Sequence, residues 1–178
     1  MSRQVKLFIA MSLDGFIAGK DDDISWLSMV EKEGKDYGYA QFMETIDTYI
    51  IGRKTYDVIR QMSGGVLPQA SQYQCYVITR QQKEPEDGVV FYRGDIGELI
   101  TSIRMKKGKD IYCDGGGEVI KLLLERNLID ECIISIIPVI LGDGKRLFTG
   151  GTPKLLLEAE KPLYFDSGLV QLKYKRKV

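Results

Sequence analysis

Short apolar runs alternate along the chain with segments whose apolar residues recur at helical spacing. Residues 5–11 form an almost continuous apolar run, as a buried strand does, whereas residues 118–126 place apolar side chains three and four positions apart, as a helix does. The pattern predicts strands at residues 5–11, 48–51, 74–79, 89–92, 110–113 and 131–139, and helices at residues 35–46, 54–62, 96–105 and 118–126. Two more strands, 155–164 and 169–176, flank the turn Asp166-Ser167-Gly168 and are predicted to form a hairpin.

The order of these elements predicts the architecture. Strands that alternate with helices form a parallel sheet covered on both faces, and a hairpin adds antiparallel strands. We therefore expect a single α/β domain over residues 1–178, with a central, mostly parallel sheet of about eight strands, helices on both faces and a C-terminal antiparallel hairpin. Apolar and polar residues alternate poorly between Ile133 and Ile137, so both faces of that strand need cover. A second subunit would supply part of it, which predicts a homodimer.

Composition excludes several classes of function. Lys plus Arg and Asp plus Glu balance at 25 each, so the net charge gives no attraction to nucleic acid or to an anionic membrane. No apolar run approaches the roughly 20 residues of a membrane span. The chain contains no histidine, which excludes Ser-His-Asp and Cys-His catalysis and zinc sites that depend on histidine. Any chemistry must use carboxylates, Tyr, Lys, bound water or a cofactor.

The cysteines indicate a reducing compartment. Cys75, Cys113 and Cys132 are odd in number and lie in apolar, strand-like runs, so we expect free core thiols instead of disulfides or a metal site. The first residues pass directly into a strand without the apolar region of a signal peptide. The expected location is cytoplasmic, and no bound metal is expected.

Two junctions between a strand and a helix carry the features of a phosphate site. Gly115-Gly116-Gly117 opens one helix, and Gly52-Arg53-Lys54-Thr55 opens another. Glycines let backbone N–H groups approach an anion, and a helix N-terminus favours negative charge. Thr79-Arg80 follows a third strand, and all three loops should meet at the carboxyl edge of the sheet. Each segment alone is more often a plain turn with solvated charges, but together they favour a pyrophosphate with an extra phosphate, hence NADPH over NADH.

These residues carry a family resemblance. The segments that match are Ser12-Leu13-Asp14-Gly15-Phe16-Ile17-Ala18, Ile51-Gly52-Arg53-Lys54-Thr55-Tyr56, Val77-Ile78-Thr79-Arg80, Gly115-Gly116-Gly117, and Leu128-Ile129-Asp130-Glu131 leading to Pro138-Val139-Ile140-Leu141-Gly142-Asp143-Gly144. In this order they resemble the dihydrofolate reductase-like superfamily, and more closely its branch related to the reductase domain of bacterial riboflavin biosynthesis. Each motif is weak alone, but their order and spacing cover nearly the whole chain.

The resemblance implies an oxidoreductase that uses NADPH to reduce a C=N or C=O group of a small pyrimidine- or pterin-like substrate. The residues it implies for cofactor binding are Ala10, Ile17, Gly52, Arg53, Lys54, Thr55, Thr79, Arg80, Gly115, Gly116, Gly117 and Glu118. Ala10 and Ile17 would flank the nicotinamide. Ile120 stands where folate-reducing enzymes carry a Tyr, so a true dihydrofolate reductase is the less favoured alternative.

Three carboxylates are the candidates for proton supply. Asp114 precedes the glycines and is the most favoured of them, whereas Asp36 lies near the place of the folate-type carboxylate and Asp14 lies in the first loop. The plain alternatives are a helix-start residue for Asp36 and a turn residue for Asp14.

Trp26 and Ser135 are candidates for substrate binding, with core packing and strand burial as their alternatives. The alternative for the whole chain is a catalytically idle nucleotide-binding or protein-interaction module of the same fold.

Overall fold

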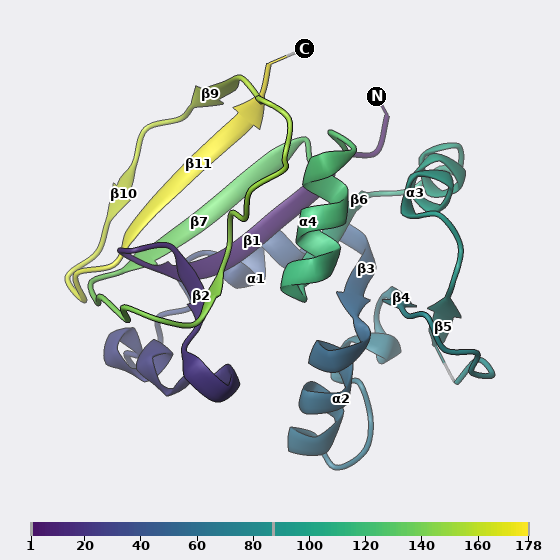
Figure 1. The fold of residues 1–178 in the computed structure, drawn as a ribbon, viewed down its shortest axis with the longest axis horizontal. Helices are drawn as coiled ribbons and strands as arrows, with labels where there is room; N and C mark the ends of the chain where they lie inside the picture. Colours follow the sequence, from purple (N-terminus) through teal and green to yellow (C-terminus); the bar gives the residue numbers. More distant parts are fainter. Residues whose placement is uncertain (1, 87, 178) are drawn as a thin grey trace.

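A mixed sheet forms the middle of the molecule, and helices lie in front of it and behind it (Figure 1). The computed structural model describes residues 2–86 and 88–177. The sheet contains β1 (Val5–Ser12), β3 (Ile46–Gly52), β4 (Gln74–Ile78), β5 (Val89–Tyr92), β6 (Asp110–Gly115), β7 (Glu131–Ile137), β10 (Leu163–Tyr164) and β11 (Val170–Arg176). Their order is β10-β11-β7-β1-β6-β3-β4-β5.

The strands run as predicted, parallel in most of the sheet and antiparallel in the C-terminal hairpin. The pairs from β7 through β1, β6, β3 and β4 to β5 are parallel, whereas β11 is antiparallel to β7 and β10. β9 (Leu157–Ala159) also pairs with β11. The predicted single α/β domain with a mostly parallel sheet and a C-terminal antiparallel hairpin is confirmed.

The helices divide the core into two main layers. One layer packs α3 (Ile96–Arg104) and α4 (Gly117–Glu125) on one face of the sheet. The other packs α1 (Tyr39–Met43) against the opposite face, together with α2 (Arg53–Met62) and η3 (Pro68–Ser71). Figure 1 shows α4 in front of the sheet and α1 behind it. Both faces are thus covered within the chain, which is why the central strands are apolar almost throughout.

The isoleucines of β7 find their cover inside the chain. Ile134 packs in the layer under α3 and α4, Ile133 packs in the layer under α1, and Ile137 packs beside Trp26. The need for outside cover, on which the expected homodimer was based, is therefore met without a second subunit. The homodimer itself stays a prediction.

Most predicted elements lie within two residues of the observed ones, but the helix predicted over 35–46 is wrong in extent. Only α1 is helical there, and Ile46 already belongs to β3. Gly34 and Gly38 have φ of 71° and 83°, and Tyr37 between them is also left-handed. These turns interrupt the helix that the spacing of the apolar residues predicts.

Two short elements also differ from the prediction. The strand predicted over 155–164 is divided into β9 and β10, because Pro162 between them has no N–H to donate to a neighbouring strand. The sequence did not reveal β2 (Phe16–Ala18) and β8 (Lys145–Arg146), which form a separate antiparallel pair. Among the residues that the structure describes, no helix is long and apolar enough to cross a membrane.

Candidate active site

The two glycine junctions meet at the carboxyl edge of the sheet. Gly52 ends β3 and caps α2, and Gly116 stands between β6 and α4. A Cβ added to Gly116 would lie 3.2 Å from Cα of Gly52 and 3.4 Å from Oγ1 of Thr55. The two backbones therefore approach each other as closely as only glycines allow, and they bring the N-termini of α2 and α4 together.

Backbone conformation adds a second requirement for glycine at the β6–α4 junction. Gly115 has φ of 129° and Gly116 has φ of 77°, which L-residues with a side chain rarely adopt. These conformations turn the chain from strand to helix within two residues. The first N–H groups of a helix have no partner inside it, so both helix starts present donors at this edge.

The predicted cations surround the junctions, although two of them have acidic neighbours. Nε of Arg53 donates to both carboxylate oxygens of Asp57 at 2.8 Å, on the same face of α2. Arg80 is almost fully exposed and lies 4.0 Å from Glu118 in the first turn of α4. Lys54 is exposed at the start of α2. Exposed pairs of this kind contribute little to stability, so an anion can compete for the two guanidinium groups.

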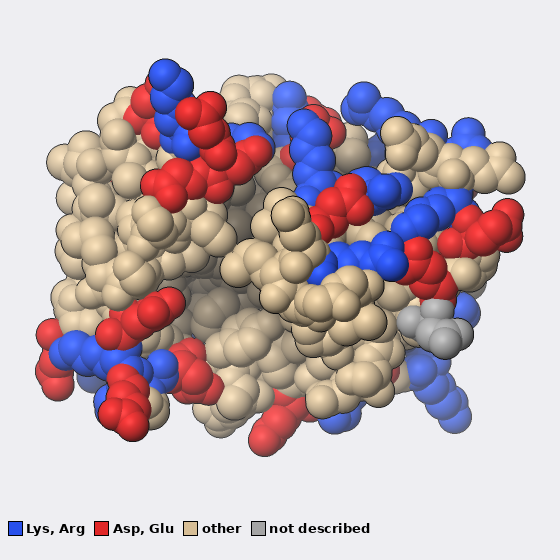
Figure 2. Space-filling view, turned by 90° about the horizontal axis from the view of Figure 1, so that it is seen from below, with Lys and Arg blue, Asp and Glu red and all other residues tan. Residues whose placement is uncertain are grey.

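Figure 2 views the molecule from below Figure 1, from the side on which α2 lies. It shows a hollow whose centre is mostly uncharged, with acidic and basic side chains on its rim. Such a surface suits a ligand with a flat, uncharged part inside the hollow and charged groups at its rim.

Asp114 occupies a β-bulge directly before the glycines. Ile50 of β3 pairs with Cys113, and Ile51 pairs with Gly115, so Asp114 between them has no partner in β3. A bulge re-aims the side chain of the extra residue and is common beside functional sites. Asp114 is half-buried and accepts hydrogen bonds from the hydroxyls of Tyr49 and Tyr112.

Burial controls the charge of this carboxyl group. It raises the pKa of Asp114 above the usual range, although the hydrogen bonds from Tyr112 and Tyr49 act in the opposite direction. The burial of both tyrosines raises their pKa values well above 10, with a further contribution from Asp114. The cluster thus contains two neutral hydroxyls around one carboxyl group that takes up a proton more readily than an exposed Asp.

Asp14 joins two loops. Its carboxylate accepts from Oγ of Ser12 at 2.6 Å and from the N–H groups of Leu141 and Gly142 at 3.1 and 2.8 Å. The hydrogen bond from Ser12 is the main cause that lowers the pKa of Asp14 to about 2. A carboxylate held in this way stays ionised at neutral pH, which favours the alternative of a turn residue over a proton donor.

Asp36 has the geometry of a helix-start residue. Its exposed carboxylate accepts from the N–H groups of Ala40 at 2.8 Å and Gly38 at 3.0 Å, around the first turn of α1. These bonds, that from Ala40 most, lower the pKa of Asp36. Of the three predicted carboxylates, Asp114 alone has a pKa shifted toward the protonated form.

Two other predicted cofactor residues, Ile17 and Thr79, lie in loops or short strands around the glycine junctions. Ile17 of β2 reaches the β6–α4 junction, since its Cδ1 would lie 3.6 Å from a Cβ added to Gly117. Thr79 is buried after β4, and its hydroxyl accepts from the N–H of Gln81 at 3.1 Å.

Ala10 of β1 pairs in register with Ser135 of β7. Ser135 is buried, and its hydroxyl accepts from Nε2 of Gln171 at 3.2 Å. Trp26 is buried in a third cluster with Val30, Ile137 and Leu169, which agrees with core packing.

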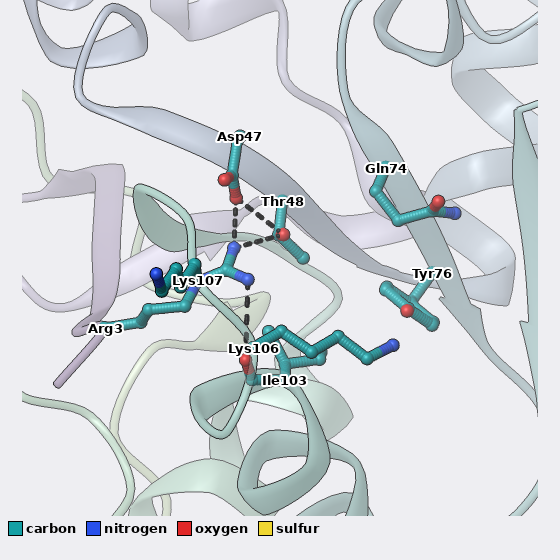
Figure 3. A pocket seen from close by; sticks show the side chains of 8 residues that line it. All are labelled: Arg3, Asp47, Thr48, Gln74, Tyr76, Ile103, Lys106 and Lys107. Carbon is teal, nitrogen blue, oxygen red and sulfur yellow. Dashed lines mark hydrogen bonds and ion pairs between the residues drawn. The ribbon is translucent and has the colours of Figure 1, made fainter.

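A different hollow, of about 250 Å³, lies at the amino-terminal ends of the strands (Figure 3). It is lined by Arg3, Asp47, Thr48, Gln74, Tyr76, Ile103, Lys106 and Lys107. Arg3 binds Asp47, Thr48 at 2.6 Å and the carbonyls of Lys109 and Ile103. All three nitrogens of its guanidinium thus have partners inside the protein. This hollow lies at the opposite end of the strands from the glycine junctions.

Sequence reasoning missed Tyr49 and Tyr112 as site residues. Tyr112 and Asp114 are two positions apart and therefore share a face of β6, which the sequence could have revealed. The contact of Tyr49 with Asp114 joins positions 65 residues apart and depends on the pairing of β3 with β6. Among residues 2–86 and 88–177, no group of three or more Cys, Asp and Glu side chains is placed to hold a metal ion.

The comparisons with known proteins agree with this fold. The solved structure of a putative riboflavin biosynthesis protein from Shewanella sp. PV-4 covers 100% of both chains at 31% identity, with a TM-score of 0.88. The dihydrofolate reductase of Enterococcus faecalis, solved in complex with NADP(H), covers 100% of both chains at 17% identity, with a TM-score of 0.64. The likeness to the second protein shows the fold alone.

Sequence comparisons give the family. The uncharacterized protein YwjB of Bacillus subtilis (strain 168) is 38% identical over 180 residues, which cover 99% of both chains. The family model described as the RibD C-terminal domain matches residues 3–171. The chain therefore belongs to the RibD C-terminal domain family.

Proposed function

We propose that this protein is a reductase that uses NADPH to reduce a C=N or C=O group of a small pyrimidine- or pterin-like molecule. One observation carries the proposal. Asp114, whose pKa is raised by burial, is the last residue but one of β6, and the glycines that follow it meet the β3–α2 junction. A proton donor and a phosphate cradle thus lie on consecutive residues at one edge of the sheet.

The chain's own residues fit the phosphates of the cofactor. The N-termini of α2 and α4 offer backbone N–H groups, Thr55 offers a hydroxyl, and Arg53, Lys54 and Arg80 offer positive charge. Glu118 lies beside Arg80, where it would orient that guanidinium. The expected contacts of Ala10 and Ile17 with the nicotinamide belong to the same proposal, as do those of Trp26 and Ser135 with the substrate.

NADPH supplies a hydride when it is bound. The protein must hold the acceptor, exclude water from it and supply the proton that completes the reduction. Asp114 is the residue that we assign to the proton. Asp14 holds the 12–18 segment against the loop around Leu141, and Asp36 accepts a hydrogen bond from the first turn of α1, so both have positioning roles in this scheme.

Calorimetric titration with NADPH and, separately, with NADH tests the cofactor. We expect micromolar binding of NADPH, weaker binding of NADH, and a loss of about tenfold or more in Arg53→Ala, because a charge-assisted hydrogen bond contributes about 1.5–3 kcal/mol. Lys121→Ala, on the exposed side of α4 and paired with Glu125, is the control and should bind as the parent does. If neither nucleotide binds, the proposal is wrong.

A catalytically idle nucleotide-binding or protein-interaction module is the second candidate. An enzyme should oxidise NADPH in the presence of some pterin, pyrimidine or carbonyl acceptor, and Asp114→Asn should abolish that turnover while it leaves NADPH affinity unchanged. A protein that binds NADPH but reduces no member of such a panel would favour the idle module. Turnover of dihydrofolate would instead identify a true dihydrofolate reductase.

We further propose that the protein is a cytoplasmic homodimer. Its thiols at Cys75, Cys113 and Cys132 are free, as in a reducing compartment. Leu157, Leu163 and Tyr164 on β9 and β10 are large apolar side chains exposed to solvent, and a second copy would cover them. Sedimentation equilibrium should give twice the mass of the chain, and a monomer at micromolar concentration would remove the homodimer.

A further inference from the structure

The carboxyl group of Asp114 is held by two tyrosines that lie side by side on adjacent strands, on the same face of the sheet. Tyr49 of β3 and Tyr112 of β6 are partners in register, and their side chains are 0% and 2% exposed. The hydroxyl of Tyr49 donates to Oδ2 of Asp114, and that of Tyr112 donates to Oδ1. Each carboxyl oxygen therefore has its own hydroxyl partner.

Tyr112 has a second acceptor within reach. Its hydroxyl lies 3.1 Å from the backbone carbonyl oxygen of Phe8 in β1. A hydroxyl carries one proton, so it donates either to Asp114 or to Phe8. When it donates to Phe8, its own oxygen is free to accept a hydrogen bond from Asp114.

These contacts allow two complete sets of hydrogen bonds. With Asp114 ionised, both tyrosine hydroxyls donate to the carboxylate. With Asp114 protonated on Oδ1, Asp114 donates to Tyr112, Tyr112 donates to Phe8, and Tyr49 still donates to Oδ2. In both states each tyrosine hydroxyl and each carboxyl oxygen of Asp114 has a partner. This matters because an unsatisfied buried group is costly.

We infer that Tyr49 and Tyr112 are positioning residues that let Asp114 hold and release one proton, with the Tyr112 hydroxyl turning between Asp114 and the carbonyl of Phe8. This inference rests on the proposed function for its purpose. In the reduction, the O–H bond of Asp114 breaks and its proton forms an N–H or O–H bond on the acceptor, whose carbon takes the hydride of the reduced nicotinamide. Asp114 is left as the carboxylate and recovers its proton from water.

Asp114 is the group of this cluster that gains or loses the proton. The other titratable side chains near the cluster are Tyr39 of α1, Tyr73, Cys75 of β4 and Cys113 of β6. Burial raises the pKa values of Tyr39, Cys75 and Cys113 to about 12. Among the described residues, no Lys or Arg is a cause of the shift at Asp114, so no nearby cation fixes the carboxyl group in its ionised form.

The test follows the proton without any cofactor. Carbon-labelled aspartate and tyrosine allow the carboxyl carbon of Asp114 to be titrated by NMR in the free protein, with Asp114→Asn to assign the signal. We expect a midpoint above that of exposed Asp residues. The Cζ carbon of Tyr112 should shift with the same midpoint, whereas that of Tyr92, whose hydroxyl donates to the carbonyl of Asp95, should not.

Two variants separate the roles of the tyrosines. The Tyr49 hydroxyl donates to Asp114 in both states, and a donor stabilises the carboxylate more than the protonated acid. In Tyr49→Phe the midpoint of Asp114 should therefore rise by about one pH unit. The Tyr112 hydroxyl donates to the carboxylate but accepts from the protonated acid, so Tyr112→Phe weakens both states and the midpoint should move by much less. Tyr92→Phe, which also loses one hydrogen bond, should leave it unchanged.

Three results would overturn the inference. They are a midpoint for Asp114 no higher than that of exposed Asp residues, a Tyr112 signal that ignores the titration of Asp114, and a rise in Tyr112→Phe as large as that in Tyr49→Phe. The first two are read in the parent protein and do not depend on the folding of a variant. The titration is done without NADPH, so a negative titration result would not argue against the proposed cofactor site. Equally, a failure of NADPH to bind in calorimetry would not change the outcome of this titration.

Discussion

Gly52 and Gly116 show how single residues build the proposed cofactor site out of backbone. A side chain on either residue would crowd the other, since a Cβ added to Gly116 would lie only 3.2 Å from Cα of Gly52. The positive φ of Gly116 is a separate requirement. The two effects can be told apart, because Gly142 has φ of 76° and no atom within 4 Å of an added Cβ.

We predict that Gly116→Ala is more destabilising than Gly142→Ala. Each substitution puts a side chain on a residue with positive φ, which costs about 1–3 kcal/mol, and only Gly116→Ala adds crowding, which costs about 1–3 kcal/mol more. Urea unfolding measures both. Gly116→Ala should also weaken NADPH binding by about tenfold or more in calorimetry, and Gly142→Ala should not. Equal costs and equal affinities would mean that the junctions tolerate a methyl group.

Site residues could be predicted from the sequence where their signal is local. Gly115 to Gly117 stand between a strand and a helix, and that order alone predicts a tight turn facing an anion. Asp114 was predicted from its place before these glycines. The β-bulge at Asp114 was not predicted, because a bulge depends on the register between β3 and β6. The sequence of either strand alone does not determine that register. Tyr49 was missed for the same reason.

Elements were predictable where one physical signal dominates. The buried central strands are continuous apolar runs, and α2, α3 and α4 begin and end within two residues of the predicted bounds. α1 was overestimated, because the helical spacing of Tyr39, Phe42 and Ile46 is also compatible with a short turn of helix followed by a strand. β2 and β8 have only three and two residues. Hydrogen bonds between distant loops, such as those from Leu141 and Gly142 to Asp14, hold these strands together.

Helix α3 offers a prediction at this scale. Asp95 caps it, since its carboxylate accepts from the N–H groups of Gly97 at 2.7 Å and Glu98 at 3.2 Å. Loss of such a cap costs about 1 kcal/mol, so Asp95→Ala should lower Tm by about 2–4 °C in a protein of this size.

Asp95→Asn is the matched variant. It loses the ion pair with Arg126 but keeps an acceptor for the cap, so its Tm should stay nearer to that of the parent. NADPH affinity should not change in either variant, because α3 is not part of the glycine junctions. Similar losses in both would assign the effect to the ion pair instead of the cap.

At the scale of the whole molecule, the sheet order explains why the site lies where it does. β1, β6 and β3 are neighbours in the centre, although β3 and β6 are separated by more than 50 residues. The central strands bring Phe8, Tyr49 and Tyr112 around Asp114, and the layer under α1 covers them. The sequence predicts a parallel sheet with a cleft at its carboxyl edge, but the order of strands that brings these four residues together comes only from the fold.

The burial of Asp114 should have a cost that the whole protein shows. Because its folded pKa is raised, protonated Asp114 is compatible with the fold, and stability falls as pH rises through that pKa. Asp114→Asn removes the charge that burial opposes. We predict that this variant and the parent unfold at similar temperatures below about pH 4, near the unfolded pKa of Asp, and that the variant becomes the more stable one as pH rises.

Thermal unfolding of both proteins between about pH 3 and pH 9 measures this difference. Asp36→Asn is the control, because the pKa of Asp36 is lowered by hydrogen bonds from Ala40 and Gly38. The stabilising effect of the Asp36 carboxylate is present above the unfolded pKa of Asp and disappears as pH falls. Asp36→Asn should therefore become less stable than the parent as pH rises, the opposite of Asp114→Asn. A difference between Asp114→Asn and the parent that does not vary with pH would mean that Asp114 keeps one charge state throughout. A widening difference, together with lost turnover, would mean that a buried carboxyl group is retained at the expense of stability because the reaction needs its proton.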